Sequence, residues 1–348
     1  RAARFRAEDR FLRASNNFHE VNAMIPLLRS EFDELAAAAA RALATETTPV
    51  VVPGEAILGI EAVARCCAAP GRRFLNLANG PYGAFFGQWL REGGAEVRDL
   101  EIPWNDVFDA QAVADALDET RPDALCYVYT EAVTGGANPA RAIQAAARAR
   151  GVITIVDAVS SVGADPFRMD EWGVDIVSIG MQKALLGSNG VSFLGVSERG
   201  LRWMRDNRRA PEHSALSVTE LYDAERAGIP AHLPVLEARD ALRAFREIEE
   251  TGGVDALVAR HRALAERVRR EAKALGFTLY QAREAACTAL NTTLELPESP
   301  AAAAFSGEGI VRPGDGALFG RLLRVNHYGV SATDEAVNAA LKTLARLL

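Results

Sequence analysis

The sequence predicts an α/β fold in which helices cover both faces of a mostly parallel sheet, followed by a smaller α+β unit. Three observations support this prediction. Strand-like and helix-like segments alternate up to about residue 200, the strands are short and wholly apolar, and long amphipathic helices dominate after about residue 230. Such alternation is typical of βα units, and short apolar strands are typical of a sheet buried on both faces.

The strands and helices of the first part follow from hydrophobic periodicity and from glycine and proline punctuation. The expected strands cover residues 73–78, 95–102, 124–129, 152–156, 176–179 and 191–196. The expected helices cover residues 31–44, 55–69, 82–92, 107–117 and 139–150. In a sheet of this kind, ligands bind beyond the carboxyl ends of the strands.

The second part has a different pattern, which predicts a separate small domain. We expect helices over residues 235–250, 254–275 and 333–347, strands over 285–296 and 322–326, and a loop over 298–319. The predicted division is a large domain over residues 1–235, with a helical segment at its start, and a small C-terminal domain over residues 236–348.

Composition narrows the class of protein. The chain has 348 residues, of which 49% are hydrophobic and 24% are charged, and its formal net charge is −7. A weakly acidic surface argues against nucleic acid or an anionic membrane as the main partner. The four cysteines have neither disulfide-framework nor zinc-site spacing. We therefore expect a cytoplasmic protein with reduced cysteines and no metal site.

Two charged residues follow neighbouring strands of the predicted sheet. Asp157 comes directly after the strand over 152–156, and Lys183 follows the strand over 176–179. Taken singly, Asp157 is more simply read as a helix cap or ion-pair partner, and Lys183 as a solvated surface lysine. Taken together, both side chains are expected to point into one crevice at the strand ends.

This pair of residues suits pyridoxal 5′-phosphate (PLP) chemistry. A lysine amine forms an imine with a carbonyl cofactor, so Lys183 is the predicted Schiff-base residue. PLP acts as an electron sink while its pyridine nitrogen stays protonated. Asp157 would keep that proton in place by a charge-assisted hydrogen bond.

Longer stretches carry a resemblance to a known family. The segments VDAVSSVGADPF, WGVDIV and GMQKALLGSNGVSFLGVSERG resemble the class V aminotransferases of PLP fold type I. They are most similar to the alanine–glyoxylate, serine–pyruvate and aminoethylphosphonate–pyruvate group, from about Asn76 to Leu348. The resemblance implies a seven-stranded sheet in the large domain and a homodimer with its active site at the subunit interface. It also implies amino transfer between a small amino acid and a 2-oxo acid of the glyoxylate or pyruvate type.

Individual residues carry the resemblance further. Tyr82, in Asn-Gly-Pro-Tyr-Gly, matches the aromatic residue that stacks on the cofactor ring. Thr134 and Glu131 fit the family's pattern in the segment after the next strand, where small hydroxyl residues lie near the cofactor. Gln182 resembles a residue that contacts the phosphate. Arg324 matches the arginine that binds the substrate carboxylate, in keeping with the bidentate fork of a guanidinium.

Two segments depart from the family pattern. At the expected phosphate-binding turn, Ala56 and Ile57 replace a glycine and a polar residue, and Glu55 would oppose a phosphate. Ile229 and His232 stand where the family has a tyrosine and a threonine that reach the partner subunit's phosphate. His232 could donate a hydrogen bond in that place.

Two alternatives stay open at the level of the sequence. A PLP-dependent lyase or epimerase shares the same aspartate and lysine, because fold and cofactor do not fix the reaction. The altered phosphate turn also suits a degenerate member of the family that binds no cofactor and serves as a binding protein. Cofactor colour and product analysis would separate these readings.

Overall fold

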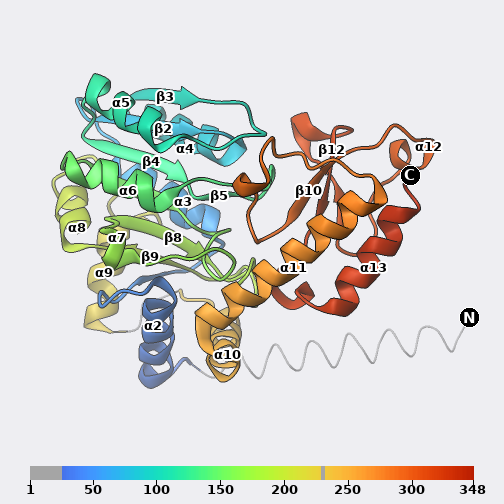
Figure 1. The fold of residues 1–348 in the computed structure, drawn as a ribbon. Coiled ribbons are helices and arrows are strands. Elements are labelled where there is room, and N and C mark those ends of the chain that lie inside the picture. Colours follow the sequence, from blue (N-terminus) through green and yellow to red (C-terminus); the bar gives the residue numbers. More distant parts are fainter. Residues whose placement is uncertain (1–25, 229–231) are drawn as a thin grey trace, which may run out of the picture.

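A seven-stranded sheet forms the centre of the larger part of the molecule (Figure 1). The computed structural model describes residues 26–228 and 232–348. The strand order is β1-β9-β8-β7-β4-β2-β3. The pairs from β3 through β8 are parallel, whereas β9 is antiparallel to both β8 and β1. The strands are β1 (Val50–Val52), β2 (Arg73–Ala78), β3 (Glu96–Glu101), β4 (Ala124–Val128), β7 (Ile153–Asp157), β8 (Ile176–Gly180) and β9 (Ser192–Val196).

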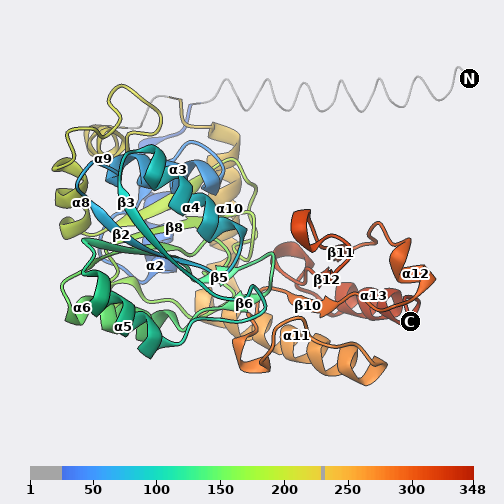
Figure 2. The same ribbon diagram turned by 90° about the horizontal axis from the view of Figure 1, so that it is seen from above.

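Helices cover both faces of this sheet, as predicted (Figure 2). One face carries α2 (Arg29–Leu43), α5 (Ala110–Thr120), α6 (Ala140–Ala149), α7 (Met169–Trp172) and α10 (Val235–Glu250). The other face carries α3 (Ala56–Cys67), α4 (Pro81–Glu92), α8 (Glu198–Arg205) and α9 (Val218–Ala227). Successive strand residues supply the two faces in turn, so Phe74 packs on the second face and Leu75 on the first.

Local caps explain one difference from the predicted boundaries. Residues 107–117 are expected to be helical, but α5 begins only at Ala110. The Asp109 carboxylate accepts hydrogen bonds from the backbone N–H groups of Gln111 and Ala112. An aspartate that caps a helix in this way lies outside the helix itself, which sets the start of α5.

The C-terminal part has its own three-stranded antiparallel sheet and hydrophobic core, which confirms a smaller α+β unit. Its elements are β10 (Thr292–Glu295), β11 (Val311–Pro313), β12 (Leu322–Val325), α11 (Gly253–Leu275), α12 (Pro300–Ala303) and α13 (Asp334–Ala345). The predicted strand over 285–296 was too long, since its first part forms a turn. The predicted loop over 298–319 contains β11, whose pairing with the distant β12 was not visible in the sequence.

The division at residues 235 and 236 stays a prediction. The buried residues of α10, such as Leu242 and Phe245, belong to the core beneath the large sheet. In α11, Leu257 belongs to that same core, whereas Leu264 and Val268 belong to the core of the small sheet. This packing favours a boundary further along the chain, within α11. Among the described helices, none combines the length and apolarity needed to cross a membrane.

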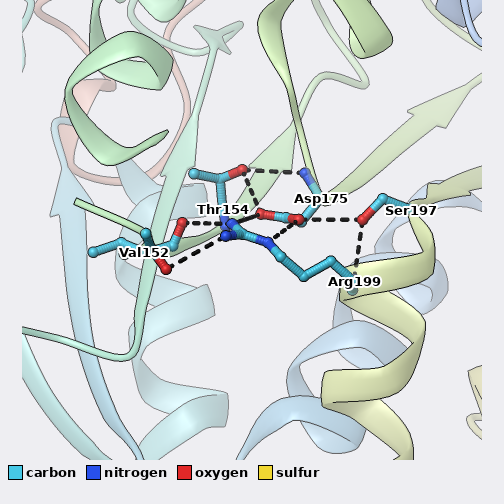
Figure 3. Close-up of polar contacts among 7 residues, drawn as sticks. Val152, Thr154, Asp175, Ser197 and Arg199 are labelled. Carbon is cyan, nitrogen blue, oxygen red and sulfur yellow. Dashed lines mark hydrogen bonds and ion pairs between the residues drawn. The ribbon is translucent and has the colours of Figure 1, made fainter. Parts of the chain in front are cut away.

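A buried carboxylate ties β7, β8 and α8 together near the start of both strands (Figure 3). Asp175 accepts hydrogen bonds from Thr154 N at 3.0 Å, Arg199 Nε at 2.8 Å and Ser197 Oγ at 3.1 Å. Arg199 also donates to the carbonyl oxygen of Val152. Because these contacts precede the strands, they anchor the end of the sheet opposite the carboxyl ends where ligands bind.

We expect Asp175→Ala to lower the free energy of unfolding by about 2–3 kcal/mol, because it leaves buried donors without an acceptor. Urea denaturation measures this change. Asp118→Ala is the matched control, since its ion pair with Arg150 is largely exposed on the aspartate side and solvent screens such pairs, so they contribute little to stability. Equal losses in both variants would contradict the structural role of Asp175.

Candidate active site

A cavity of about 300 Å³ lies at the carboxyl ends of β4, β7 and β8, beside the first turns of α3 and α4. Its position is the one expected for a ligand site in a parallel sheet. The residues that line it are Glu55, Ala56, Ile57, Ile60, Tyr82, Phe85, Val128, Thr130, Asp157, Val159, Ser160, Gln182 and Lys183.

Asp157 is the last residue of β7, and the parallel ladder places it beside Val128 of β4 and Ser178 of β8. The backbone N–H of Val159 donates to Asp157 Oδ1 at 3.0 Å, which fixes the carboxylate at the cavity wall. Burial raises the pKa of Asp157 to about 6, and the positive charge of Lys183 acts in the opposite direction. The carboxylate is therefore poised to ionise fully when a cation lies beside it.

Lys183 follows β8 and lines the same cavity as Asp157. Asp157 and Lys183 thus line one cavity, as predicted, while their chemical roles stay predictions. The amine Nζ lies 5.7 Å from the centre of the Tyr328 ring, which belongs to the small unit. The backbone of Gly329 lies against that of Lys183, since a Cβ atom on this glycine would be 2.6 Å from the carbonyl oxygen of Lys183.

Tyr82 occupies the first turn of α4 and lines the cavity as a partly buried ring. Burial raises the pKa of the Tyr82 phenol, and the carboxylates of Glu131 and Asp157 raise it further. The ring meets Phe85 edge-on, with 6.2 Å between ring centres. Together the two rings give one side of the cavity an aromatic wall, which suits a flat aromatic ligand.

The first of the two departures from the family pattern, at the expected phosphate-binding turn, lies at the start of α3. Glu55 is the N-cap of this helix, and its Oε2 accepts from the backbone N–H of Ile57 at 3.2 Å. Its Oε1 accepts a hydrogen bond from Gln182 Nε2. Gln182 Oε1 is buried and has no hydrogen-bond partner among the described residues. This end of the cavity therefore presents the carboxylate of Glu55, and the Gln182 amide beside it holds one oxygen without a partner among the described residues.

These contacts decide how well PLP fits. The aromatic wall, Asp157 and Lys183 suit the pyridoxal ring and its carbonyl carbon. The phosphate end fits poorly, because Glu55 already takes the N–H of Ile57 at the helix start and repels an anion. The unpaired Gln182 Oε1 needs a donor, which a phosphate dianion lacks and a hydroxyl group provides.

Sequence reasoning did not select several residues that the structure brings to the site. Phe85, Thr130 and Ser160 line the cavity. Glu131 lies fully buried, and its carboxylate accepts from the backbone N–H of Tyr82 at 3.3 Å. Burial raises the pKa of Glu131 to about 7. Glu131, unlike the other three, was already matched to a family segment near the cofactor, but nothing in the sequence indicated that it would contact Tyr82.

Three residues predicted for the site do not line the cavity. Thr134 is buried, and its carbonyl oxygen accepts from Gln281 Nε2 and Thr293 Oγ1 of the small unit. The turn that carries it, between β5 (Thr130–Glu131) and β6 (Gly136–Ala137), faces the small sheet rather than the hollow.

The other two residues, Arg324 and His232, also lie away from the cavity wall, in different surroundings. Arg324 lies on β12, where Nη2 binds the Asp315 carboxylate and the buried Nε has no partner among the described residues. Its charge still lowers the pKa of Tyr82, so it acts on the site electrostatically. His232 is exposed, with a left-handed φ of 70°, and Ile229 lies outside the described residues.

Comparisons with known proteins agree with this geometry. The sequence model of the family described as aminotransferase class-V matches residues 38–299. A pyridoxamine–pyruvate transaminase from Mesorhizobium japonicum is 30% identical over 328 residues, which span 92% of this chain and 83% of that protein. An L-aspartate–glyoxylate aminotransferase from Paracoccus denitrificans is 26% identical over 86% of this chain and 78% of its own length.

Solved structures show the same relationship. Pyridoxamine–pyruvate aminotransferase from Mesorhizobium loti superposes with a TM-score of 0.86 at 30% identity, covering 92% of this chain and 83% of that one. Alanine–glyoxylate aminotransferase from Nostoc sp. shares the fold with a TM-score of 0.84 at 24% identity, over 92% and 86% of the two chains.

The predicted fold type, enzyme class and amino-transfer activity are thereby confirmed. PLP is the cofactor of this family, which confirms the predicted cofactor class, while Glu55 at the phosphate end of this cavity departs from the family pattern. The relatives named above are aminotransferases, which favours amino transfer over the lyase, the epimerase and the cofactor-free binding protein. The chain belongs to the class-V aminotransferases, a family of PLP-dependent enzymes of fold type I.

Proposed function

We propose that this enzyme transfers the amino group of pyridoxamine to pyruvate, so that the vitamin ring enters as the amino donor without its phosphate. The observation that carries this proposal is the acceptor-rich end of the cavity formed by Glu55 and Gln182. A hydroxymethyl group donates a hydrogen bond there, whereas a phosphate meets a carboxylate. The name of the relative from Mesorhizobium japonicum, a pyridoxamine–pyruvate transaminase, supports the same substrates.

Three residues are proposed to act on the ring. A bound pyridoxal ring supplies an electron sink. Asp157 holds the proton on the pyridine nitrogen by a charge-assisted hydrogen bond. Lys183 would hold the ring in its aldehyde form as an imine, with loss of water, and as a free amine it would carry the proton between the ring's C4′ and the carbon of the 2-oxo acid. Tyr82 stacks on the ring and holds it flat against the sheet end.

The 2-oxo acid carboxylate is proposed to bind Arg324. The buried Nε of this guanidinium lacks a partner among the described residues, while Nη2 holds the exposed carboxylate of Asp315. A substrate carboxylate that displaces Asp315 would complete the bidentate grip. Arg312 lies directly opposite Arg324 in the β11–β12 ladder. Like charges in such a position repel each other, and an anion bound between them relieves that cost.

We propose a homodimer whose second copy covers the mouth of the cavity. Phe85 of α4 lines the cavity, and Leu58 lies in the first turn of the neighbouring helix α3. The two side chains are 47% and 42% exposed, which is unfavourable for large apolar groups on neighbouring helices. Phe85 also contacts the Trp89 ring. In such a dimer the exposed His232 of one subunit would be available to the other. A cytoplasmic location is proposed because the four cysteines are free thiols.

The Schiff-base role of Lys183 is tested by Lys183→Ala. We expect borohydride to fix no pyridoxyl group on the variant and amino transfer to fall roughly a thousandfold, because both covalent capture and proton transfer need the amine. The chain has three lysines, at 183, 273 and 342, so mass spectrometry localises the label. Lys273→Ala should keep both properties. Labelling at Lys273 or Lys342 would refute the assignment.

The preference for an unphosphorylated ring is tested by Glu55→Gln. The unaltered enzyme should bind pyridoxal more tightly than PLP, and the variant should raise the affinity for PLP relative to pyridoxal by roughly ten- to a hundredfold. Equilibrium titration by absorbance measures both constants. Glu61→Gln changes a glutamate of the same helix that pairs with Arg65 and should leave the ratio unchanged. Tighter binding of PLP to the unaltered enzyme would overturn the substrate proposal and favour an amino acid donor.

Ring binding should depend on the ionisation of Asp157. Since burial raises its pKa to about 6 in the ligand-free protein, Asp157 is protonated below that pH and must lose its proton to pair with a pyridinium. Affinity for pyridoxal should then fall by up to about tenfold per pH unit below pH 6. Asp157→Asn should bind weakly and lose this limb of the pH profile. A profile that is unchanged in the variant would exclude Asp157 as its source.

A further inference from the structure

Glu131 is a buried carboxylate beside the cavity that the proposed function does not use. It is fully buried on β5, and its two oxygens have different partners. Oε1 accepts from the backbone N–H of Val133 in its own turn at 3.2 Å. Oε2 accepts from the backbone N–H of Tyr82 at 3.3 Å, 49 positions away in the sequence. One side chain therefore bridges the hairpin and the start of α4.

The start of α4 has no cap of its own. Its N-cap is Gly80, which has no side chain, and Pro81 at the first helical position has no N–H group. The first available donor of the helix is thus the N–H of Tyr82. Glu131 supplies the missing acceptor from another part of the chain, and its negative charge is favourable at a helix N-terminus.

The turn before α4 is shaped to admit this carboxylate. A Cβ atom on Gly80 would lie 2.3 Å from Glu131 Cγ and 2.4 Å from its Oε2. Any larger residue that could cap the helix locally would therefore displace Glu131. Burying a carboxylate is costly, and the raised pKa of Glu131 reflects that cost. Because Gly80 has no side chain, the buried Glu131 carboxylate can reach the backbone N–H of Tyr82 despite this cost.

We propose that Glu131 is a positioning residue for the amino-transfer reaction, which fixes the first turn of α4 and thereby holds the Tyr82 ring against the substrate ring. This proposal rests on the stacking role of Tyr82 in the proposed function. Glu131 acts through the backbone of Tyr82 and does not line the cavity itself. Its removal should disturb the geometry of the stacked ring more than the stability of the fold.

A double-mutant cycle between Glu131 and Tyr82 tests this role. Glutamine offers one acceptor oxygen, so Glu131→Gln places its amide N–H₂ against one of the two backbone N–H groups. We expect Glu131→Gln to lower kcat/KM roughly ten- to fiftyfold. Tyr82→Leu alone should cause a comparable loss. In the Tyr82→Leu background, Glu131→Gln should cost no more than about twofold, because the ring that it positions is gone.

Induced circular dichroism of bound pyridoxal gives a second readout, since it reports the orientation of the ring in the site. Both single variants should weaken the signal, and the double variant should resemble Tyr82→Leu. If Glu131→Gln fails to fold, Gly80→Ala provides the same test by pushing an unaltered carboxylate away from Tyr82.

The outcomes separate the two proposals. If the two losses of kcat/KM multiply in the double variant, the positioning role alone is overturned. The same holds if Glu131→Gln keeps full activity while Tyr82→Leu has low activity. Full activity in Tyr82→Leu would remove Tyr82 from the proposed function and the positioning role with it.

Discussion

The site depends on the parallel pairing of β7 with β8. This register sets Asp157, the last residue of β7, beside Ser178 of β8, so the chain that leaves β8 after Gly180 can return Lys183 to the cavity that Asp157 lines. An acid and an amine in one hollow are costly to bury separately and stabilise each other together. The network around Asp175 anchors the same two strands near their other end, so the spacing of the two charged residues follows from the sheet.

The balance of charge in the cavity sets what it can hold. Glu55 and Asp157 line it, Glu131 lies beneath Tyr82, and Lys183 is the cation among its lining residues. An excess of carboxylates favours a ligand that brings positive charge and hydrogen-bond donors. Pyridoxamine has both, in its amine, its protonated ring and its hydroxymethyl group. The same charges disfavour a phosphate dianion, which supports the proposal of an unphosphorylated ring.

The small unit contributes to the site directly. The loop after β12 brings Gly329 against the backbone of Lys183 and the Tyr328 ring near its amine. At a second place, the carboxylate of Asp165 accepts hydrogen bonds from Thr130 and from Thr288 of the small unit. The two units therefore meet both at Lys183 and at Asp165. Any movement of the small unit would change the surroundings of that amine.

The sequence by itself determined the alternating architecture and the placement of Asp157 and Lys183 in one crevice, because strand periodicity and strand-end charges are local properties. The class of enzyme came from the resemblance of longer segments to a known family. Glu55 was also visible as an obstacle to phosphate. Only the tertiary structure placed Thr134 against the small sheet and joined Glu131 to Tyr82. Those contacts link residues far apart in the chain, and no local pattern specifies which way a side chain turns once two units pack together.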